Sequence, residues 1–545
     1  MLTKKNKPFK SPLQKDQDRK EFFVGLLSAV LLGLSFPPIP LPYLVFVALA
    51  PYFSVITKNK SLGEINRFTY FVALIFNITT IYWVGSWTPD ADPFLMVAGS
   101  VLIFFNPLVF LIPSTLFYLA KKYVHKDVAL FLLPWFWLFY EYIYSISDFK
   151  FPWLSLSNSL PYFEQYIQIA DIIGAYGLTV LIVYTNIFVY LLIRHLRRND
   201  KIAYVYLALL FVIIILPLYY GISKINNYNE SNEKIKVGLI QPNLNPNKKW
   251  EVGNLDEQID LYFVLSQSAI DDGASIVIWP ETALPVYLLT DKYKTQTNRL
   301  QRFVDSLKVP ILTGMPHANF YPNQSTAPED AKPVKGKASV YTSYNSILFF
   351  KPNNEVEQYG KIKLVPFGEK VPLVDIIPVL GKWFKWNVGI SSWNTGTEKK
   401  IFQLDIDSTQ VNIGGVVCIE TIYADFVAGF VDKGADFIAV VTNDSWYGNS
   451  SGPYQHKEIS VLRAVENRRT VVRAANGGIS CIINPLGKTV VDTEMFTKRI
   501  LVGDVPLNKK RTYFTANPLV FPYISIGISV LVMLMSIVMK VVKKK

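Results

Sequence analysis

Val411-Asn412-Ile413-Gly414-Gly415-Val416-Val417-Cys418-Ile419-Glu420 is a short apolar run that ends on a cysteine and an acidic residue. Its length and its β-branched residues predict a buried strand. A side chain at the end of such a strand has a fixed direction, so Cys418 suits a nucleophile. Taken alone, the segment favours a cysteine that only packs in the core. Residues elsewhere in the chain decide between the two interpretations.

Two other strand ends or adjacent loops carry residues that complement a thiol, namely Glu281 and Lys361. A carboxylate can take the proton from a thiol and return it to a leaving group. An ammonium group lowers the pKa of a nearby thiol and stabilises an oxyanion. We therefore expect Glu281, Lys361 and Cys418 to act together in covalent catalysis, with the cysteine holding an acyl group as a thioester.

Predicted strands and helices alternate around these residues, which indicates an α/β domain. The predicted strands cover residues 236–241, 275–279, 310–314, 343–351, 411–417, 437–442, 471–475 and 479–484. The predicted helices cover residues 255–271, 290–307, 423–433 and 454–469. Several strands end in polar residues, so the functional groups should collect at one edge of the sheets.

The rest of the chain is strongly apolar, although the formal net charge is +13. A membrane-spanning helix needs about 20 apolar residues. The predicted spans are residues 21–36, 41–57, 68–87, 94–120, 128–146, 166–193, 202–222 and 518–538. The first two are short and separated by a proline-rich segment, so we expect either a tight hairpin or a partly re-entrant pair.

Basic stretches fall at every second connection between these spans: 4–20, 58–67, 121–126, 194–201 and 540–545. Basic loops stay in the cytoplasm, so both termini should be cytoplasmic and the α/β domain should lie outside, in the periplasm of a Gram-negative cell. The positive charge is thus a topology signal, and no nucleic-acid partner is expected. The expected division is a basic N-terminus (1–20), seven spans (21–222), a linker (223–235), a catalytic domain (236–507), and a last span with a basic tail (508–545).

Three motifs resemble those of the nitrilase (carbon–nitrogen hydrolase) superfamily, in the same order and spacing. They are Trp279-Pro280-Glu281-Thr282, Lys361 with Val365-Pro366-Phe367-Gly368-Glu369, and Cys418-Ile419-Glu420. The resemblance spans about residues 236–507 and implies an αββα sandwich with a Glu-Lys-Cys triad. Together with the predicted spans, the chain resembles the apolipoprotein N-acyltransferases, the membrane-embedded members of this superfamily.

This resemblance implies a role for each matching residue. Glu281 is the base, Lys361 stabilises the oxyanion and Cys418 is the nucleophile, while Glu369 orients the lysine or an incoming amine. Ile419 stands where the family often has an aromatic residue, and its backbone N–H remains available for an oxyanion hole. Glu420 supports the site, and Trp250 and Trp446 resemble substrate-binding tryptophans. An ion pair at Glu369, and interfacial anchoring by the two tryptophans, are the alternatives.

The resemblance also implies the substrates. The acyl donor is a phospholipid such as phosphatidylethanolamine, and the acceptor is the N-terminal amine of a diacylated apolipoprotein, which completes lipoprotein maturation in ping-pong order. The enzyme is expected to be a monomer in the bacterial inner membrane, with no cofactor and no metal.

Two other interpretations stay open at this point. The chain could be a membrane-tethered amidase that uses the same triad with water as the acceptor. It could also be a non-enzymatic protein in which Cys418 and Cys481 form a disulfide in an oxidising compartment.

Overall fold

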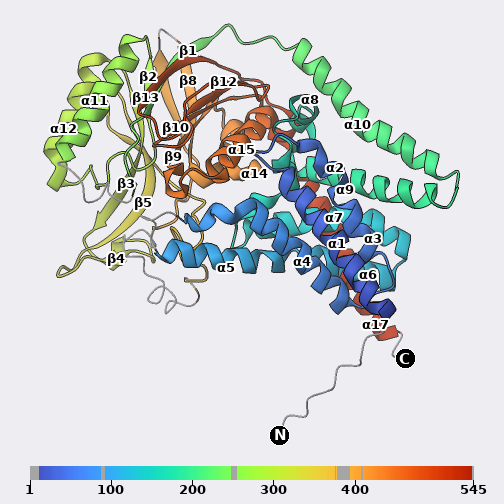
Figure 1. Ribbon diagram of the computed structural model, residues 1–545. Coiled ribbons are helices and arrows are strands. Elements are labelled where there is room, and N and C mark those ends of the chain that lie inside the picture. Colours follow the sequence, from blue (N-terminus) through green and yellow to red (C-terminus); the bar gives the residue numbers. More distant parts are fainter. Residues whose placement is uncertain are drawn as a thin grey trace.

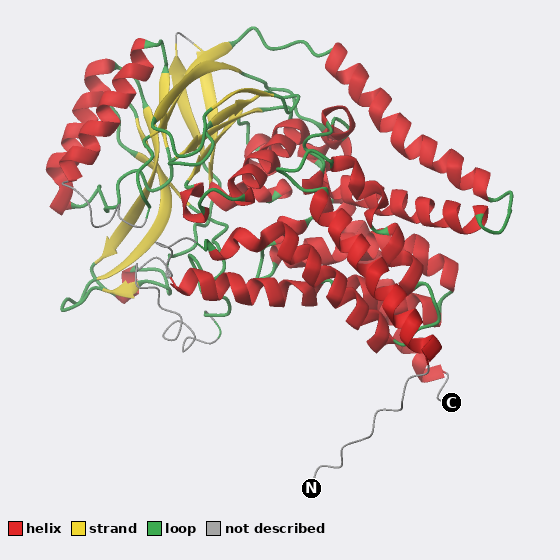
Figure 2. Cartoon of the chain, in the orientation of Figure 1, coloured by secondary structure: helices red, strands yellow, loops and turns green. Residues whose placement is uncertain are grey.

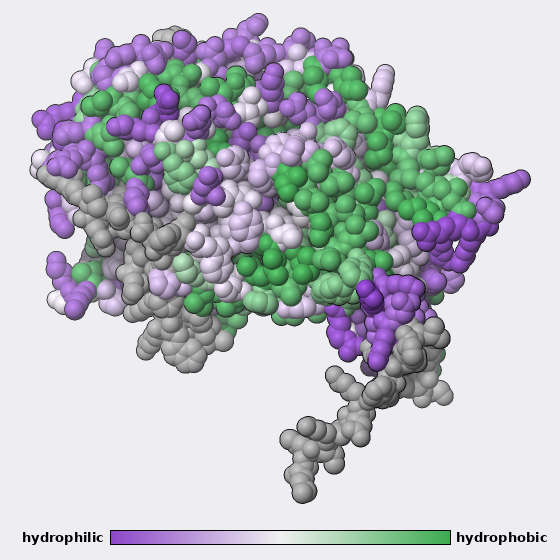
Figure 3. Space-filling model, in the orientation of Figure 1, coloured by the Kyte–Doolittle hydropathy of each residue, from purple (hydrophilic) through white to green (hydrophobic). Residues whose placement is uncertain are grey.

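The computed structural model describes residues 12–87, 93–246, 255–374, 376, 393–406 and 409–542. It contains a helical part and a two-sheet part, which lie side by side (Figures 1 and 2). Apolar surface gathers over the helical part and polar surface over much of the two-sheet part (Figure 3). This division confirms the predicted fold class, a multi-pass helical membrane domain joined to an α/β domain.

The helical part contains both ends of the described chain. Its α-helices are α1 (Pro12–Leu34), α2 (Val45–Ala48), α3 (Ala50–Ile56), α4 (Leu62–Ile81), α5 (Pro93–Val109), α6 (Leu111–Tyr123), α7 (Lys126–Ile146), α8 (Glu164–Ile167), α9 (Ala170–Leu196), α10 (Ala203–Asn226), α16 (Tyr513–Ala516) and α17 (Val520–Val542). Its 3-10 helices are η1 (Pro42–Leu44), η2 (Tyr82–Gly85), η3 (Pro152–Leu154) and η4 (Leu156–Ser159).

Within the described residues, six helical segments are long and apolar enough to cross a membrane. They are Leu62–Gly85, Leu95–Tyr123, Lys126–Ile146, Ala170–Leu196, Ala203–Asn226 and Val520–Val542. Each overlaps one of the last six predicted spans. The first two predicted spans are not among these six segments. Helix α1 begins in a charged segment, and the second predicted span is broken into η1, α2 and α3. Both α2 and α3 pack on α1, as expected for a hairpin.

The α/β part contains two sheets. The first has the strand order β13-β1-β2-β3-β5-β4, with β6 also paired to β5, and the second has the order β12-β11-β10-β9-β8-β7. The strands of the first sheet are β1 (Lys234–Gln241), β2 (Ile276–Trp279), β3 (Ile311–Tyr321), β4 (Lys332–Pro333), β5 (Val340–Phe350), β6 (Glu357–Gly360) and β13 (Arg499–Pro506). Those of the second are β7 (Ile401–Ile406), β8 (Thr409–Val417), β9 (Phe437–Thr442), β10 (Thr470–Ala475), β11 (Cys481–Ile483) and β12 (Thr489–Asp492).

The two sheets pack face to face through contacts of β1 with β10, β2 and β3 with β9, and β5 with β8. Helices α11 (Leu255–Asp271) and α12 (Lys294–Leu307) cover the outer face of the first sheet, and α14 (Ala424–Asp432) and α15 (Ser451–Asn467) cover the second (Figure 1). The result is the expected αββα sandwich. In each sheet three central strands run parallel, so the loops that follow β2 and β8 can meet at one edge.

Sequence reasoning gave bounds for eight of the strands, expected β6 as a strand before Tyr359 without bounds, and missed β4, β7, β12 and β13. The largest omission is β13, which pairs antiparallel with β1 over its full length although about 260 residues separate them. The strands predicted at 310–314 and 343–351 are longer than expected. They form the long antiparallel hairpin of β3 and β5, from Ile311 to Tyr321 and from Val340 to Phe350.

Candidate active site

A buried lysine between two buried glutamates forms the centre of the site. The Nζ atom of Lys361 lies 2.9 Å from the carboxylate of Glu369 and 3.4 Å from Oε1 of Glu281. Lys361 is 1% exposed, and each glutamate is 7% exposed. Charges buried this deeply are stable only when they are paired, so the three side chains form one electrostatic unit.

Asn345 on β5 holds this unit in place. Its amide Nδ2 donates to Oε1 of Glu281 at 2.8 Å and to Oε1 of Glu369 at 2.7 Å. Its backbone carbonyl accepts from the N–H of Lys361 at 2.8 Å. Sequence reasoning missed Asn345. The available signal was an amide side chain in the middle of a strand that the sequence predicts to be buried.

Each of the three predicted catalytic residues follows the end of a strand. Glu281 follows β2, Lys361 follows β6, and Cys418 follows β8. The backbone at Glu281 packs tightly against β3, because a Cβ atom on Gly314 would lie 2.6 Å from Cα of Glu281. Only glycine permits that approach. Cys418 opens the 3-10 helix η7 (Cys418–Ile422) with φ of +50°, a left-handed conformation uncommon for a side chain other than glycine.

The charges of Glu281 and Lys361 act on the thiol in opposite directions. Burial and the carboxylate of Glu281 raise the pKa of Cys418, while Lys361 lowers it, and the net direction is upward. Burial disfavours the ammonium of Lys361, but Glu369 and Glu281 outweigh burial and raise its pKa. At neutral pH the resting site therefore contains a charged lysine and a protonated thiol. Glu281 is the carboxylate whose charge acts on this thiol.

Glu420 joins the segment at Cys418, which we call the cysteine loop, to residues 361–369, which we call the lysine loop. Its Oε1 accepts from the hydroxyl of Tyr359 at 2.8 Å and from the N–H groups of Ile362 and Lys363 at 2.7 and 3.1 Å. Its Oε2 accepts from the N–H of Val417 at 2.9 Å. Burial raises the pKa of Glu420 even though these N–H groups favour the carboxylate. Glu420, the predicted supporting residue, thus fixes the backbone next to Cys418 relative to the loop of Lys361.

The other predicted residues lie as follows. Oε2 of Glu369 also accepts from the N–H of Val365 at 2.8 Å, so this glutamate closes the lysine loop. Ile419 is the second residue of η7, and an N–H at that position has no acceptor within its own helix. Trp446 lies in η8 (Asp444–Tyr447), and its carbonyl accepts from Oγ of Ser86 at the end of a membrane helix, at 2.6 Å. Trp250 falls outside the described residues.

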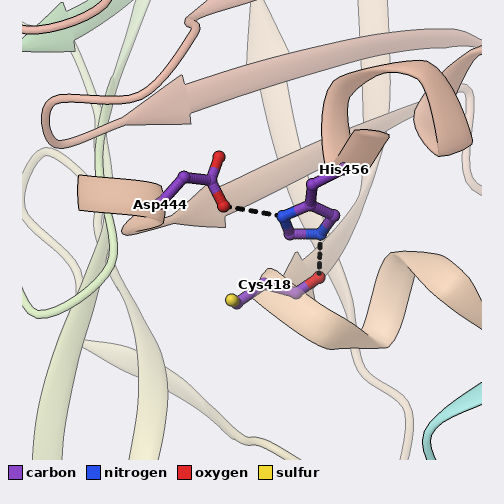
Figure 4. A group of neighbouring side chains, drawn as sticks. All are labelled: Cys418, Asp444 and His456. Atoms are coloured by element: carbon purple, nitrogen blue, oxygen red, sulfur yellow. Dashed lines mark hydrogen bonds and ion pairs between the residues drawn. The ribbon is translucent and has the colours of Figure 1, made fainter. Parts of the chain in front are cut away.

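A second polar group adjoins the cysteine. The sulfur of Cys418, the carboxylate of Asp444 and the ring of His456 offer atoms within 4.8 Å of one another. The ring and the carboxylate are already engaged: Nδ1 of His456 lies 2.7 Å from Asp444, whose other oxygen accepts from Arg473 at 2.7 Å. Nε2 faces the backbone oxygen of Cys418 at 3.2 Å, while the sulfur points away from the ring (Figure 4). The histidine therefore supports the cysteine backbone and does not pair with the thiol.

Both cysteines are free thiols. Cys481 lies on β11 and is fully buried, whereas Cys418 is partly exposed at the start of η7. The structure therefore does not contain the disulfide that the non-enzymatic interpretation requires. Cys481 serves as a core side chain.

A buried glutamine connects the site to the membrane helices. Oε1 of Gln455, the residue before His456, accepts from the indole N–H groups of Trp83 at 3.0 Å and Trp153 at 2.7 Å. Its Nε2 donates to the carbonyls of Pro37 and Thr80, both at 3.0 Å. All four partners belong to the helical part. We call this group the Gln455 joint.

Comparison with known proteins agrees with both halves of this architecture. Residues 236–513 match the model of the carbon–nitrogen hydrolase family, and residues 28–188 match that of the apolipoprotein N-acyltransferase N-terminal domain. A protein from Chlorobaculum tepidum with the name apolipoprotein N-acyltransferase is 32% identical over 530 residues, which cover 96% of this chain and 97% of that protein. The chain belongs to the apolipoprotein N-acyltransferase family.

Other members of the family are similarly related to the chain. The apolipoprotein N-acyltransferase of Geobacter metallireducens is 30% identical over 513 residues, which cover 93% of each protein. Among solved structures, the alignment with Nit3, a nitrilase-superfamily member from Saccharomyces cerevisiae, covers 54% of this chain and 97% of the Nit3 chain. The sequence identity is 15% and the TM-score is 0.37. The alignment with family members over nearly the whole chain includes the membrane helices as well as the sandwich.

Thiol alkylation tests the electrostatics of the site. Replacing Glu281 with Gln removes a charge that raises the pKa of Cys418, so the pH at half-maximal alkylation by iodoacetamide should fall. Lys361→Gln should shift this midpoint upward, because the ammonium lowers the pKa. Cys418→Ser is the control and should take up no label, since Cys481 is buried. Identical midpoints in the wild type and both variants would contradict the arrangement.

Thermal unfolding in detergent tests the Gln455 joint. Gln455→Leu keeps the volume but removes the bonds to the indole N–H of Trp153 and the carbonyl of Pro37, while the Trp83 indole keeps its bond to the carbonyl of Thr80. Each buried group that loses its partner costs about 1–3 kcal/mol, so unfolding should become easier by at least about 2 kcal/mol. Gln403→Leu, an exposed glutamine on β7, is the matched control and should change stability by less than about 0.5 kcal/mol. Equal melting temperatures for the two variants would show that the joint contributes nothing.

Proposed function

We propose that this chain transfers a fatty acyl group from a membrane phospholipid to the N-terminal amine of a diacylated apolipoprotein, through a thioester on Cys418. Membership of the apolipoprotein N-acyltransferase family supports the overall reaction. The observation that carries the mechanism is the buried unit of Lys361, Glu281 and Glu369 beside a protonated thiol.

In the first half-reaction Glu281 takes the proton of Cys418, and the sulfur attacks the ester carbonyl of the phospholipid. The carbonyl oxygen becomes an oxyanion, which the ammonium of Lys361 and the N–H of Ile419 stabilise. The C–O bond of the ester then breaks. The lysophospholipid leaves with the proton held by Glu281, and the acyl group stays on sulfur.

In the second half-reaction the amine of the apolipoprotein attacks the thioester carbonyl. Glu281 takes a proton from the amine, the C–S bond breaks, and the sulfur recovers a proton as the amide forms. The two acyl transfers use the same sulfur and the same oxyanion position, so the lysophospholipid leaves before the second substrate reacts. Glu369 keeps Lys361 charged and in place through both halves.

The loops of the site contact the ends of the membrane helices. The ring of Tyr447 lies 4.7 Å from that of Trp83, and the ring of Phe367 in the lysine loop lies 6.4 Å from that of Phe149. The N–H of Leu373 donates to Asp148 at 3.1 Å. These contacts support a donor that reaches Cys418 from the bilayer, since a phospholipid acyl chain leaves apolar surroundings only at a high free-energy cost.

Mass spectrometry of the purified protein with phosphatidylethanolamine tests the reaction. The wild type should gain one acyl group on Cys418 and pass it to a diacylated lipopeptide, and Cys418→Ala should gain none. Lys361→Met should slow adduct formation about a hundredfold or more, because it removes an oxyanion partner. An adduct that only water discharges would favour a hydrolase. A wild type that gains no adduct would refute the thioester.

The orientation in the membrane is part of the same proposal. Basic connections such as 194–201 belong in the cytoplasm, which places both termini inside and the sandwich on the periplasmic face of the inner membrane. A membrane-impermeant maleimide tests this in a Cys418→Ser background. Glu355→Cys, on the sandwich, should be labelled in intact spheroplasts, and Arg198→Cys only after permeabilisation. The reverse pattern would invert the topology.

A further inference from the structure

A large cavity lies between the end of α10 and the sandwich. Its volume is about 1140 Å³, and it is lined by the last turns of α10, the following linker to β1, and the segment that leads from β13 into α16. The base of the cavity includes Asp171, at the start of α9. The cavity therefore lies where the membrane helices meet the catalytic domain.

The lining is strongly basic. Five basic side chains and two acidic ones line the cavity, and the basic ones are Lys224, Arg468, Lys509, Lys510 and Arg511. A cavity with this excess of positive charge attracts an anion.

The ion pairs leave part of this charge available. Arg468 and Lys224 share Asp171, at 3.0 and 3.4 Å, and the hydroxyl of Tyr220 also donates to that carboxylate at 2.8 Å. Lys509 lies 3.1 Å from Glu233, in a pair more than half exposed. Exposed pairs contribute little free energy and can exchange for another anion.

The segment after β13 contributes the remaining charge. Arg511 contacts Asp432 in a pair that is about half exposed. Lys510 is exposed, and it makes no ion pair with any residue in the described ranges. Lys509, Lys510 and Arg511 thus present three adjacent cations at the mouth of the cavity.

The sequence of α10 places this mouth at the level of the lipid headgroups. Helix α10 forms the outer edge of the helical part (Figure 1), and its exposed surface is apolar (Figure 3). Tyr204 and Tyr219, about 70% exposed, lie near its two ends. Aromatic residues in such positions mark the membrane–water interfaces. Lys224 comes little more than one turn after Tyr219, at the depth of lipid phosphates.

The cavity is separate from the site that contains Cys418. Arg511 meets Asp432, the last residue of α14, whereas Cys418 precedes the first residue of that helix. The nine residues of α14 span about 13 Å. The residues that line the cavity include none of the proposed catalytic residues.

From these observations we propose that the cavity binds the phosphate headgroup of an anionic phospholipid, at a site distinct from the acyl donor. A zwitterionic headgroup would bring its ammonium into a cavity already rich in cations. A lipid with a net negative charge, such as phosphatidylglycerol, has no such penalty. The bound lipid would hold the linker between α10 and β1 against the membrane surface.

Lipid titration of the full-length protein in neutral detergent tests the site. All proteins carry Cys418→Ser, so acylation cannot contribute and the outcome does not depend on the proposed reaction. Phosphatidylglycerol should raise the melting temperature in a concentration-dependent way, and phosphatidylcholine should not. Lys509→Gln with Lys510→Gln should weaken the apparent affinity about tenfold, since each cation near a membrane surface contributes a several-fold attraction. The matched control, Lys335→Gln with Lys337→Gln in the β3–β5 hairpin, should respond as the parent does.

An equal response to phosphatidylcholine would overturn the proposal. So would an unchanged affinity in the Lys509 and Lys510 variant, or the same loss of affinity in the control variant. If inorganic phosphate at the same concentration raises the melting temperature as much as phosphatidylglycerol does, the cavity binds a free anion, and the proposal of a lipid site is wrong. If the double variant does not fold, Arg511→Gln with native mass spectrometry of bound phosphatidylglycerol replaces it, with the same expected loss.

Discussion

One buried ammonium group holds two buried carboxylates together in the interior of the sandwich. Without Lys361, Glu281 and Glu369 would be two like charges that share the amide of Asn345 and are almost cut off from water. Burial opposes a charge on each of these side chains, and their mutual attraction offsets that cost. The positions of two loops follow from this unit, because the loop after β2 contributes Glu281 and the loop after β6 contributes both Lys361 and Glu369.

Burial, together with the charges of this unit, explains why Cys418 rests in its protonated form. Burial and the carboxylate of Glu281 raise the pKa of the thiol more than the ammonium of Lys361 lowers it, so Cys418 keeps its proton at rest. The protein then needs a rigid link between the cysteine and the cation, and Glu420 supplies it with N–H bonds from both loops. A neutral resting thiol is also less susceptible to oxidation than a thiolate.

The sequence carried much of this information, but unevenly. Glu281 and Cys418 could be identified because each follows an apolar strand, and Lys361 because it belongs to a motif that resembles one of the nitrilase superfamily. The structure brings the three together. Asn345 could not be assigned, since its role depends on which loops lie opposite β5. Strand β13 gave no local signal, because its pairing with β1 depends on a partner about 260 residues away. The amphipathic pattern of α11 is local, and its predicted limits match the observed Leu255–Asp271. The structure of the discontinuous segment from Pro42 to Ile56 was harder to predict, because a proline-rich apolar sequence is compatible with several backbone conformations.

The Gln455 joint also bears on how the protein is made. Its four partners all precede the glutamine in the chain, so they are synthesised first. They are Pro37, Thr80, Trp83 and Trp153. The helical segments that carry them can be inserted and packed before the second half of the sandwich is synthesised. The joint then gives that half a preformed docking point on the helical part. Biogenesis in this order lets the membrane domain act as a template for the enzyme that it anchors.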